Sequence, residues 1–306
     1  MQRPPTAIKN RLNLFILVIL FTVRFTISAH AAAPIPVVAT LPILQDLVEV
    51  AGLPHVTVSS LISGFESEHT YTPKPSDLIL IQKAKILFQI GLGLEVWVNP
   101  LIKNAGRANL PIITTSEGVS LIQDPEDDHP DHDHPAGNPH IWLDPQNVKI
   151  MMRHISEGLS LADPDHRKDY EKNTSNYIQK LETLEKELET KVDRLKEKKI
   201  ITHHPAWPYF AQRFGFEIRG NLLTQIGSEP SAKKMGGIIR QIKKEGIRVI
   251  VSEPQLNPKI PQILAEETGV TIVPLSPLPG AIPGTTHYLD LIRYNVEALV
   301  SVLEKY

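Results

Sequence analysis

The chain has 306 residues, of which 42% are hydrophobic and 22% charged, with a formal net charge of −2 and no cysteine. This length allows one large domain or two of medium size, and the composition is not that of a disordered or membrane-embedded chain. The lack of cysteine excludes disulfides, thiolate metal ligands and a lipid-modified cysteine.

Residues 1–31 are predicted to be a secretory signal peptide. Basic residues precede an apolar run at 12–23, and the small residues at 29–33 fit a cleavage site near Ala31. The apolar run is about half of the roughly 20 residues that a membrane-spanning helix needs, which disfavours an uncleaved anchor. Cleavage would remove four basic residues and change the net charge to −6. We therefore expect a soluble periplasmic protein without a nucleic-acid partner, because phosphate binding needs a basic face.

Residues 32–162 are predicted to form a first α/β lobe, in which apolar runs alternate with amphipathic stretches. Near-continuous apolar strands between helices indicate a parallel sheet covered on both faces. A loop at 124–139 lacks apolar periodicity and carries three histidines among six acidic residues. Strands are expected at 36–40, 56–59, 85–90 and 111–114, and helices at 44–51, 76–84, 95–105 and 146–161.

Residues 163–199 are predicted to hold one long charged helix. Its portion over 173–199 would be roughly 40 Å long at about 1.5 Å per residue. The apolar stripe is too short for an isolated coiled coil, so we expect this helix to pack along both halves of the molecule. The stripe consists of Tyr170, Tyr177, Leu181, Leu184, Leu188, Val192 and Leu195.

Residues 200–306 are predicted to form a second α/β lobe, with Ser231 as the N-cap of one helix. The predicted fold class is therefore α/β, with two parallel-sheet lobes joined by one long bridging helix. Strands are expected at 200–202, 216–218, 248–251 and 270–274, and helices at 207–214, 231–245, 258–268 and 288–304.

Three histidines lie where loops are expected to leave strands or to meet helices: His69, His140 and His204. Ligands of open α/β sheets bind outside the carboxyl ends of the strands, so a site built from all three would lie in the cleft between the lobes. Neutral imidazoles bind zinc, copper, iron and nickel, and three histidines with an open fourth position form a common zinc set. Taken singly, each histidine could equally be a surface or capping residue.

The sequence around these histidines resembles the solute-binding proteins of zinc and manganese ABC importers, and most closely the periplasmic zinc-binding branch. The resemblance covers nearly all of the chain after the signal segment, and the fold of the family agrees with the fold predicted above. Its motifs are EHTYTPKPSD at 68–77, NPHIWLDP at 138–145, HPAWPYF at 204–210, SEPQLNPK at 252–259 and TTHYLD at 285–290.

The resemblance implies that His69, His140 and His204 are metal ligands of a binding protein that is not an enzyme. Family members commonly have an aspartate where this chain has Ser276, and a serine hydroxyl is a poor ligand, so the fourth ligand stays open. Glu68 is the first candidate, a water molecule the second, and Glu253, which matches a ligand of manganese-type members, the third.

The resemblance also implies a function: high-affinity capture of Zn²⁺ and its delivery to the membrane permease of an ABC importer, by a protein that we expect to be a monomer. Manganese prefers more oxygen ligands than this set offers, which favours zinc. Mn²⁺ or Fe²⁺ is the alternative cargo. Zinc-branch members have a similar acidic loop. We predict that His129, His132 and His134 bind metal weakly as an auxiliary site that transport does not require; a loop without a metal role is the alternative.

Other histidines receive different roles. His203 is the rival of His204, but neighbours on a strand point to opposite faces, and the motif selects His204. Asp144 could accept a hydrogen bond from a ligand imidazole, with a simple Asp-Pro turn as the alternative. Four further histidines after the signal segment are expected to be structural or surface residues: His55, His154, His166 and His287.

Two other classes of function are open. A periplasmic zinc hydrolase could ionise water on three histidines, but the chain has no His-Glu-x-x-His motif. An adhesin would have to be retained at the surface, and no cysteine is present to carry a lipid anchor.

Overall fold

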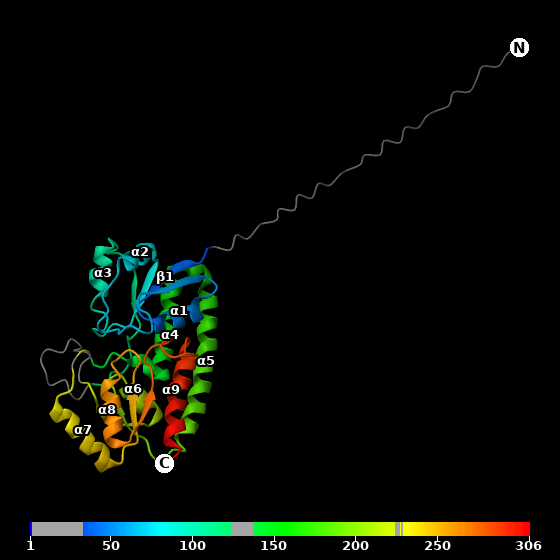
Figure 1. Ribbon diagram of the computed structural model, residues 1–306. Helices are drawn as coiled ribbons and strands as arrows, with labels where there is room; N and C mark the ends of the chain where they lie inside the picture. Colours follow the sequence, from blue (N-terminus) through cyan, green and yellow to red (C-terminus); the bar gives the residue numbers. More distant parts are fainter. Residues whose placement is uncertain (2–32, 124–136, 224–226, 228) are drawn as a thin grey trace. The chain divides into compact units, whose positions relative to one another are not determined.

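The computed structural model in Figure 1 describes Met1 and residues 33–123, 137–223, 227 and 229–306. The signal segment, from its second residue on, and positions 124–136 of the acidic loop lie outside the described residues. Within the described part, no helix combines the length and the apolar character needed to cross a membrane.

The first lobe is built on a four-stranded sheet in which every pair of neighbours is parallel, with the order β2-β1-β3-β4. Helices connect consecutive strands, as parallel pairing requires. The strands are β1 (Ile35–Ala39), β2 (Val56–Ser60), β3 (Ile86–Gln89) and β4 (Ile112–Thr114), and the helices are α1 (Pro42–Gly52), α2 (Pro75–Lys83), α3 (Val98–Asn104) and α4 (Pro145–Ala162).

The second lobe repeats this topology, with a parallel sheet in the order β6-β5-β7-β8. The sequence shows no repeat at the level of residues, so the likeness of the two lobes is visible only in the fold. The strands are β5 (Lys199–Thr202), β6 (Glu217–Asn221), β7 (Val249–Ser252) and β8 (Thr271–Pro274), and the helices are α6 (Pro208–Phe214), α7 (Ala232–Glu245), α8 (Lys259–Thr268) and α9 (Tyr288–Leu303).

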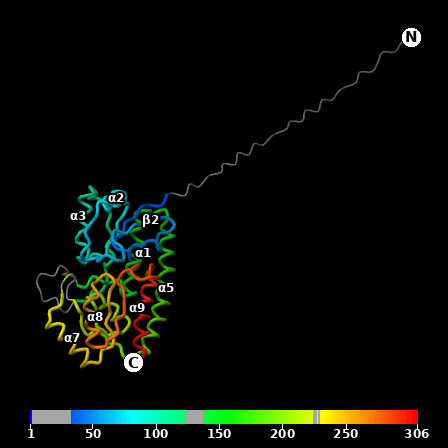
Figure 2. The backbone as a smooth tube through the Cα atoms, in the orientation of Figure 1, coloured from blue at the N-terminus to red at the C-terminus, as the bar shows by residue number. Residues whose placement is uncertain are grey.

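Helix α5 (Arg167–Val192), which follows a short 3₁₀ helix η2 (Pro164–His166), joins the two lobes. It contacts α1 and α4 of the first lobe and α6 and α9 of the second, and Figure 2 traces it beside α1 and α9. All seven residues of the predicted apolar stripe are buried. The predicted fold of two parallel-sheet lobes and one long connecting helix is confirmed; the domain limits 32–162, 163–199 and 200–306 remain a proposal.

Two predicted helix boundaries are wrong. Helix α5 ends at Val192 rather than 199: Leu195, the last residue of the predicted stripe, is buried but lies beyond the helix, and Lys199 already begins β5. Helix α3 begins at Val98 rather than at Glu95, because the carboxylate of Glu95 accepts hydrogen bonds from the backbone N–H groups of Ile90 and Gly91 in the preceding turn. The prediction also missed a 3₁₀ helix, η1 (Ile141–Leu143).

The alternation of side chains along β5 divides the interior of the second lobe. Ile200 packs in a large core that also contains buried residues of the first lobe and of α5. Its neighbour Ile201 points to the other face of the sheet and packs in a smaller core beneath α7 and α8. The N-cap of α7 is Ser231, as predicted, and its hydroxyl accepts a hydrogen bond from the backbone N–H of Lys234.

Candidate metal site

Four side chains that the sequence singles out converge at one point between the two lobes. Each of Glu68, His69, His140 and His204 offers one ligand atom, and these atoms all lie within 4.8 Å of one another. Nε2 of His140 lies 3.1 Å from Nε2 of His69 and 3.3 Å from Oε1 of Glu68, which is 3.8 Å from Nε2 of His69. In a tetrahedral zinc site with bonds of about 2.0–2.1 Å, ligand atoms are roughly 3.4 Å apart. The three distances among His69, His140 and Glu68 are close to this value, and His204 completes the group of four within 4.8 Å.

Glu68 and His69 lie in the loop that joins β2 to α2. This loop is held from behind by Asp77 in the first turn of α2, whose carboxylate accepts hydrogen bonds from the Tyr71 hydroxyl and the backbone N–H of Lys74, both at 2.7 Å. The side chain of Glu68 is buried, whereas that of His69 is 19% exposed. Of these two side chains, that of His69 is therefore the one that solvent can reach.

His140 is oriented by the residue two positions before it. Oδ1 of Asn138 lies 3.0 Å from Nδ1 of His140 and also accepts from the backbone N–H of His140. The amide nitrogen of Asn138 donates to the carbonyl oxygen of Pro205, and its backbone oxygen accepts from the hydroxyl of Tyr209. Asn138 thus ties His140 to the turn of the second lobe that carries His204.

His204 follows β5 and Glu253 follows β7, at the point where the strand order of the second sheet changes direction. Nδ1 of His204 lies 2.8 Å from the carboxylate of Glu253, which also accepts from Nε1 of Trp207 at 3.1 Å. An ionised carboxylate can only accept, so Nδ1 carries the hydrogen and Nε2 is the atom that we expect to face a metal.

The electrostatics of the cluster favour an ionised carboxylate beside a neutral imidazole. Burial raises the pKa of Glu68, but the hydrogen bond with His140 and the charges of His69, His140 and His204 outweigh it and lower the pKa to about 2. Burial lowers the pKa of His140 despite the opposing effect of Glu68. These are the protonation states that a divalent cation needs, because protons compete with the metal for the same lone pairs.

The other predicted candidates lie outside the cluster. Glu253, the less favoured candidate ligand, instead contacts His204. The hydroxyl of Ser276 donates to the carbonyl of Leu278 and accepts from its N–H. His203 is buried, and its Nδ1 lies 3.4 Å from the backbone N–H of Glu253. The predicted auxiliary ligands lie outside the residues that the structure describes: His129, His132 and His134.

Of the two roles considered for Asp144, the structure does not show the hydrogen bond with a histidine of the cluster. Its carboxylate caps α4 by accepting from the backbone N–H of Gln146, and it pairs with the guanidinium of Arg213 at 2.7 Å. A negative charge at the N-terminus of a helix is stabilised by the helix dipole, which explains why Asp-Pro occurs here. Asn138 is the residue that contacts the ring of His140, and no feature of the sequence singled it out.

Four other histidines make structural contacts, as expected: His55, His154, His166 and His287. His55 lies 2.9 Å from Asp169 and stacks on His166, with ring centroids 3.7 Å apart. His287 lies 2.6 Å from Asp46, and His154 lies 2.9 Å from the carbonyl oxygen of Glu117.

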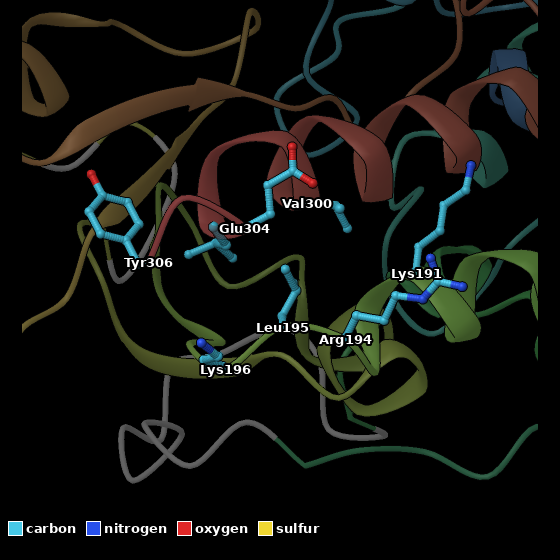
Figure 3. A pocket seen from close by; sticks show the side chains of 8 residues that line it. Lys191, Arg194, Leu195, Lys196, Val300, Glu304 and Tyr306 are labelled. Carbon is cyan, nitrogen blue, oxygen red and sulfur yellow. The ribbon is translucent and has the colours of Figure 1, made fainter.

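A separate pocket of about 330 Å³ lies between the C-terminal ends of α5 and α9. Figure 3 shows Lys191 and Arg194 on one side of it and Val300 and Glu304 on the other. None of the four clustered side chains lines this pocket, so it is not part of the metal site.

Comparisons with known proteins agree with this arrangement. Residues 37–302 match the family model described as zinc-uptake complex component A, periplasmic. The high-affinity zinc uptake system protein ZnuA of Brucella suis biovar 1 (strain 1330) is 29% identical over 282 residues, which cover 80% of this chain and 84% of that protein.

Two solved structures share the fold. A crystal structure of ZnuA superposes with a TM-score of 0.78 and 28% identity, covering 88% of this chain and 99% of the other. A manganese-bound periplasmic metal-binding protein from Candidatus Liberibacter asiaticus superposes with a TM-score of 0.74 and 27% identity, covering 87% of this chain and 98% of the other.

Proposed function

The chain belongs to the family of periplasmic zinc-uptake complex component A proteins, and from this membership we propose that it captures Zn²⁺ between its two lobes and delivers it to an ABC importer. The observation that carries the proposal is the convergence of three imidazoles and one carboxylate, from both lobes, with their ligand atoms within 4.8 Å of one another. The zinc ion is the cargo of this protein.

We propose His69, His140, His204 and Glu68 as the four ligands. The nitrogen-rich set supports zinc over manganese, since manganese prefers carboxylate, carbonyl and water oxygens. Mn²⁺ and Fe²⁺ remain the alternative cargo, and one structural neighbour is described as manganese-bound. Weak auxiliary binding by His129, His132 and His134 stays a prediction from the sequence.

Transport rather than catalysis is the role that the site supports. Four protein ligands fill a tetrahedral zinc shell and leave no position for the activated water that a zinc hydrolase needs. The relatives named above are uptake and metal-binding proteins, which agrees with a binding function. We propose that the mature protein works as a soluble monomer in the periplasm, after cleavage near Ala31, and that its partner is the importer's membrane permease.

The deciding experiment measures metal content and competition on the protein from residue 32 on, beside a His140→Ala variant. We expect about one tightly bound zinc per wild-type chain, not displaced by equimolar manganese, and a loss of affinity of at least about a hundredfold in the variant, because one of four coordinate bonds is removed. Tighter binding of manganese would reverse the choice of cargo. No tight metal in the wild type would remove the proposed function.

A further inference from the structure

The loop that carries Glu68 and His69 is fastened to the second lobe at Gly64. The side-chain nitrogen of Gln255 donates a hydrogen bond of 2.7 Å to the backbone oxygen of Gly64. Gly64 lies in the loop after β2, and Gln255 lies in the turn after β7. Only three residues separate Gly64 from Glu68, so the contact acts on the ligand-bearing loop itself.

The donor of this hydrogen bond is held in place by a second one. The same nitrogen of Gln255 lies 2.9 Å from the hydroxyl oxygen of Ser276. That hydroxyl already donates to the carbonyl oxygen of Leu278 at 2.8 Å, so it accepts from Gln255. A backbone carbonyl also can only accept, which means that both partners require the NH₂ end of the amide to face them. Gln255 is thus a pre-oriented donor on the second lobe.

The steric fit at Gly64 supports the same contact. A Cβ atom added there would lie 2.1 Å from the carbonyl oxygen of Pro279 and 3.0 Å from the backbone nitrogen of Ala281. Both atoms belong to the backbone that follows β8 in the second lobe, so they cannot swing aside as a long side chain would. The loop approaches the second lobe more closely than any side chain at position 64 would allow.

We propose that Gln255 and Gly64 form a latch between the lobes, which positions Glu68 and His69 for the metal and slows its release. The inference rests on the proposed function, since it assigns a role in holding the zinc that the cluster binds. Gln255 is a positioning residue and does not itself touch the metal. A hydrogen bond that joins the two lobes favours the arrangement in which both hold the metal, and its loss should act mainly on the dissociation rate.

The first test measures zinc release into a chelator by stopped flow. Replacing Gln255 by alanine should accelerate dissociation roughly two- to tenfold, which is the effect of one net hydrogen bond, with little change in the association rate. Gln262→Ala is the matched control, because Gln262 is an exposed glutamine of the same lobe in α8. Unchanged release from Gln255→Ala overturns the proposal.

A second variant, Gly64→Ala, disrupts the same contact from the first lobe, because the added methyl group would collide with the backbone at Pro279. We expect faster release in this variant as well, and a Gly64→Ala/Gln255→Ala double variant that releases zinc no faster than the more affected single variant. Such non-additivity is the signature of two residues that act through one interaction. Multiplied effects in the double variant would mean that the two residues act separately, and would also overturn the latch.

A measurement without metal separates this proposal from the proposed function. In metal-free protein, amide hydrogen exchange over residues 61–74 should be faster in Gln255→Ala than in the wild type or in Gln262→Ala, while β1 and β5 stay protected and show that the variant is folded. Equal exchange over 61–74 overturns the latch whether or not zinc binds. Absence of zinc binding in the wild type removes the proposed function and leaves the exchange result to decide the latch.

Discussion

Glu253 lies outside the cluster of four but contacts one of its members, His204. The carboxylate of Glu253 is buried and accepts hydrogen bonds from two ring N–H groups, on His204 and Trp207. It fixes the tautomer of His204 and makes the opposite ring nitrogen more basic, which strengthens a bond from that nitrogen to a metal.

Replacing Glu253 by glutamine should therefore weaken zinc binding about ten- to a hundredfold, the usual cost of removing a partner of a metal-bound histidine. Competition titration against a chelator of known affinity measures the effect. Glu266→Gln, at an exposed position of α8, is the control with the same change of charge. A loss as large as that in His140→Ala would instead point to Glu253 as a direct ligand.

Acid should destabilise the metal-free protein through its buried histidines. Burial lowers the pKa of both His140 and His203, so below the unfolded value of about 6.5 the unfolded chain binds more protons than the folded one. The free energy of unfolding should fall as the pH decreases through this value. Glu68, whose pKa is lowered to about 2, adds stability that is lost only below about 4.5.

His287 provides the internal control for this pH dependence. Its hydrogen bond and ion pair with Asp46 raise its pKa, so its contribution is present below the unfolded value and is lost as the pH rises through the folded one. Urea unfolding midpoints at pH 7.5 and 5.5 should show a loss in the wild type and a steeper loss in His287→Gln. An equal slope in the two proteins would contradict this assignment.

At the scale of elements, α5 depends on its apolar stripe. Leu188 is fully buried in this helix, whereas Lys180 of the same helix is exposed. Leu188→Ala should lower the free energy of unfolding by about 2–5 kcal/mol, because it removes transfer energy and leaves a cavity. Lys180→Ala should change it by less than about 0.5 kcal/mol. Urea denaturation distinguishes the two, and a small effect of Leu188→Ala would mean that the helix contributes little to folding.

The elements that the sequence predicts well are those with a local signal. The stripe of α5, the N-cap at Ser231 and the apolar strands each express a period or a cap within a short window. The start of α3 is different, because Glu95 is drawn out of the helix by backbone groups in the turn before it. These hydrogen bonds depend on the folded shape of the turn and therefore could not be predicted from the sequence.

In the candidate site, too, some features could be predicted from the sequence and others could not. The histidines and Glu68 stand out through their motifs, whereas the contacts that orient them join residues far apart in the chain. Asn138 reaches Pro205, and Gln255 reaches Gly64 across 191 positions. No periodicity or spacing encodes such pairs, since each depends on how the two lobes meet.

At the scale of the whole molecule, the two lobes share one core and one helix. The larger core contains buried residues of both sheets and of α5, so we expect the lobes to unfold together. The proposed ligands come from both lobes, with His204 contributed by the second. A metal bound there would add a connection between the lobes, and its binding free energy would stabilise both lobes at once.

Zinc should therefore raise the melting temperature of a single cooperative transition. At a free zinc concentration a thousand times the dissociation constant, the stabilisation is about 4 kcal/mol, which corresponds to a rise on the order of 10 °C for a protein of this size. Calorimetry with and without zinc measures the shift, and His140→Ala should lose most of it. Two melting transitions, of which zinc shifts only one, would contradict the shared core. A ligand held by both lobes can stabilise one lobe alone only if the lobes unfold independently.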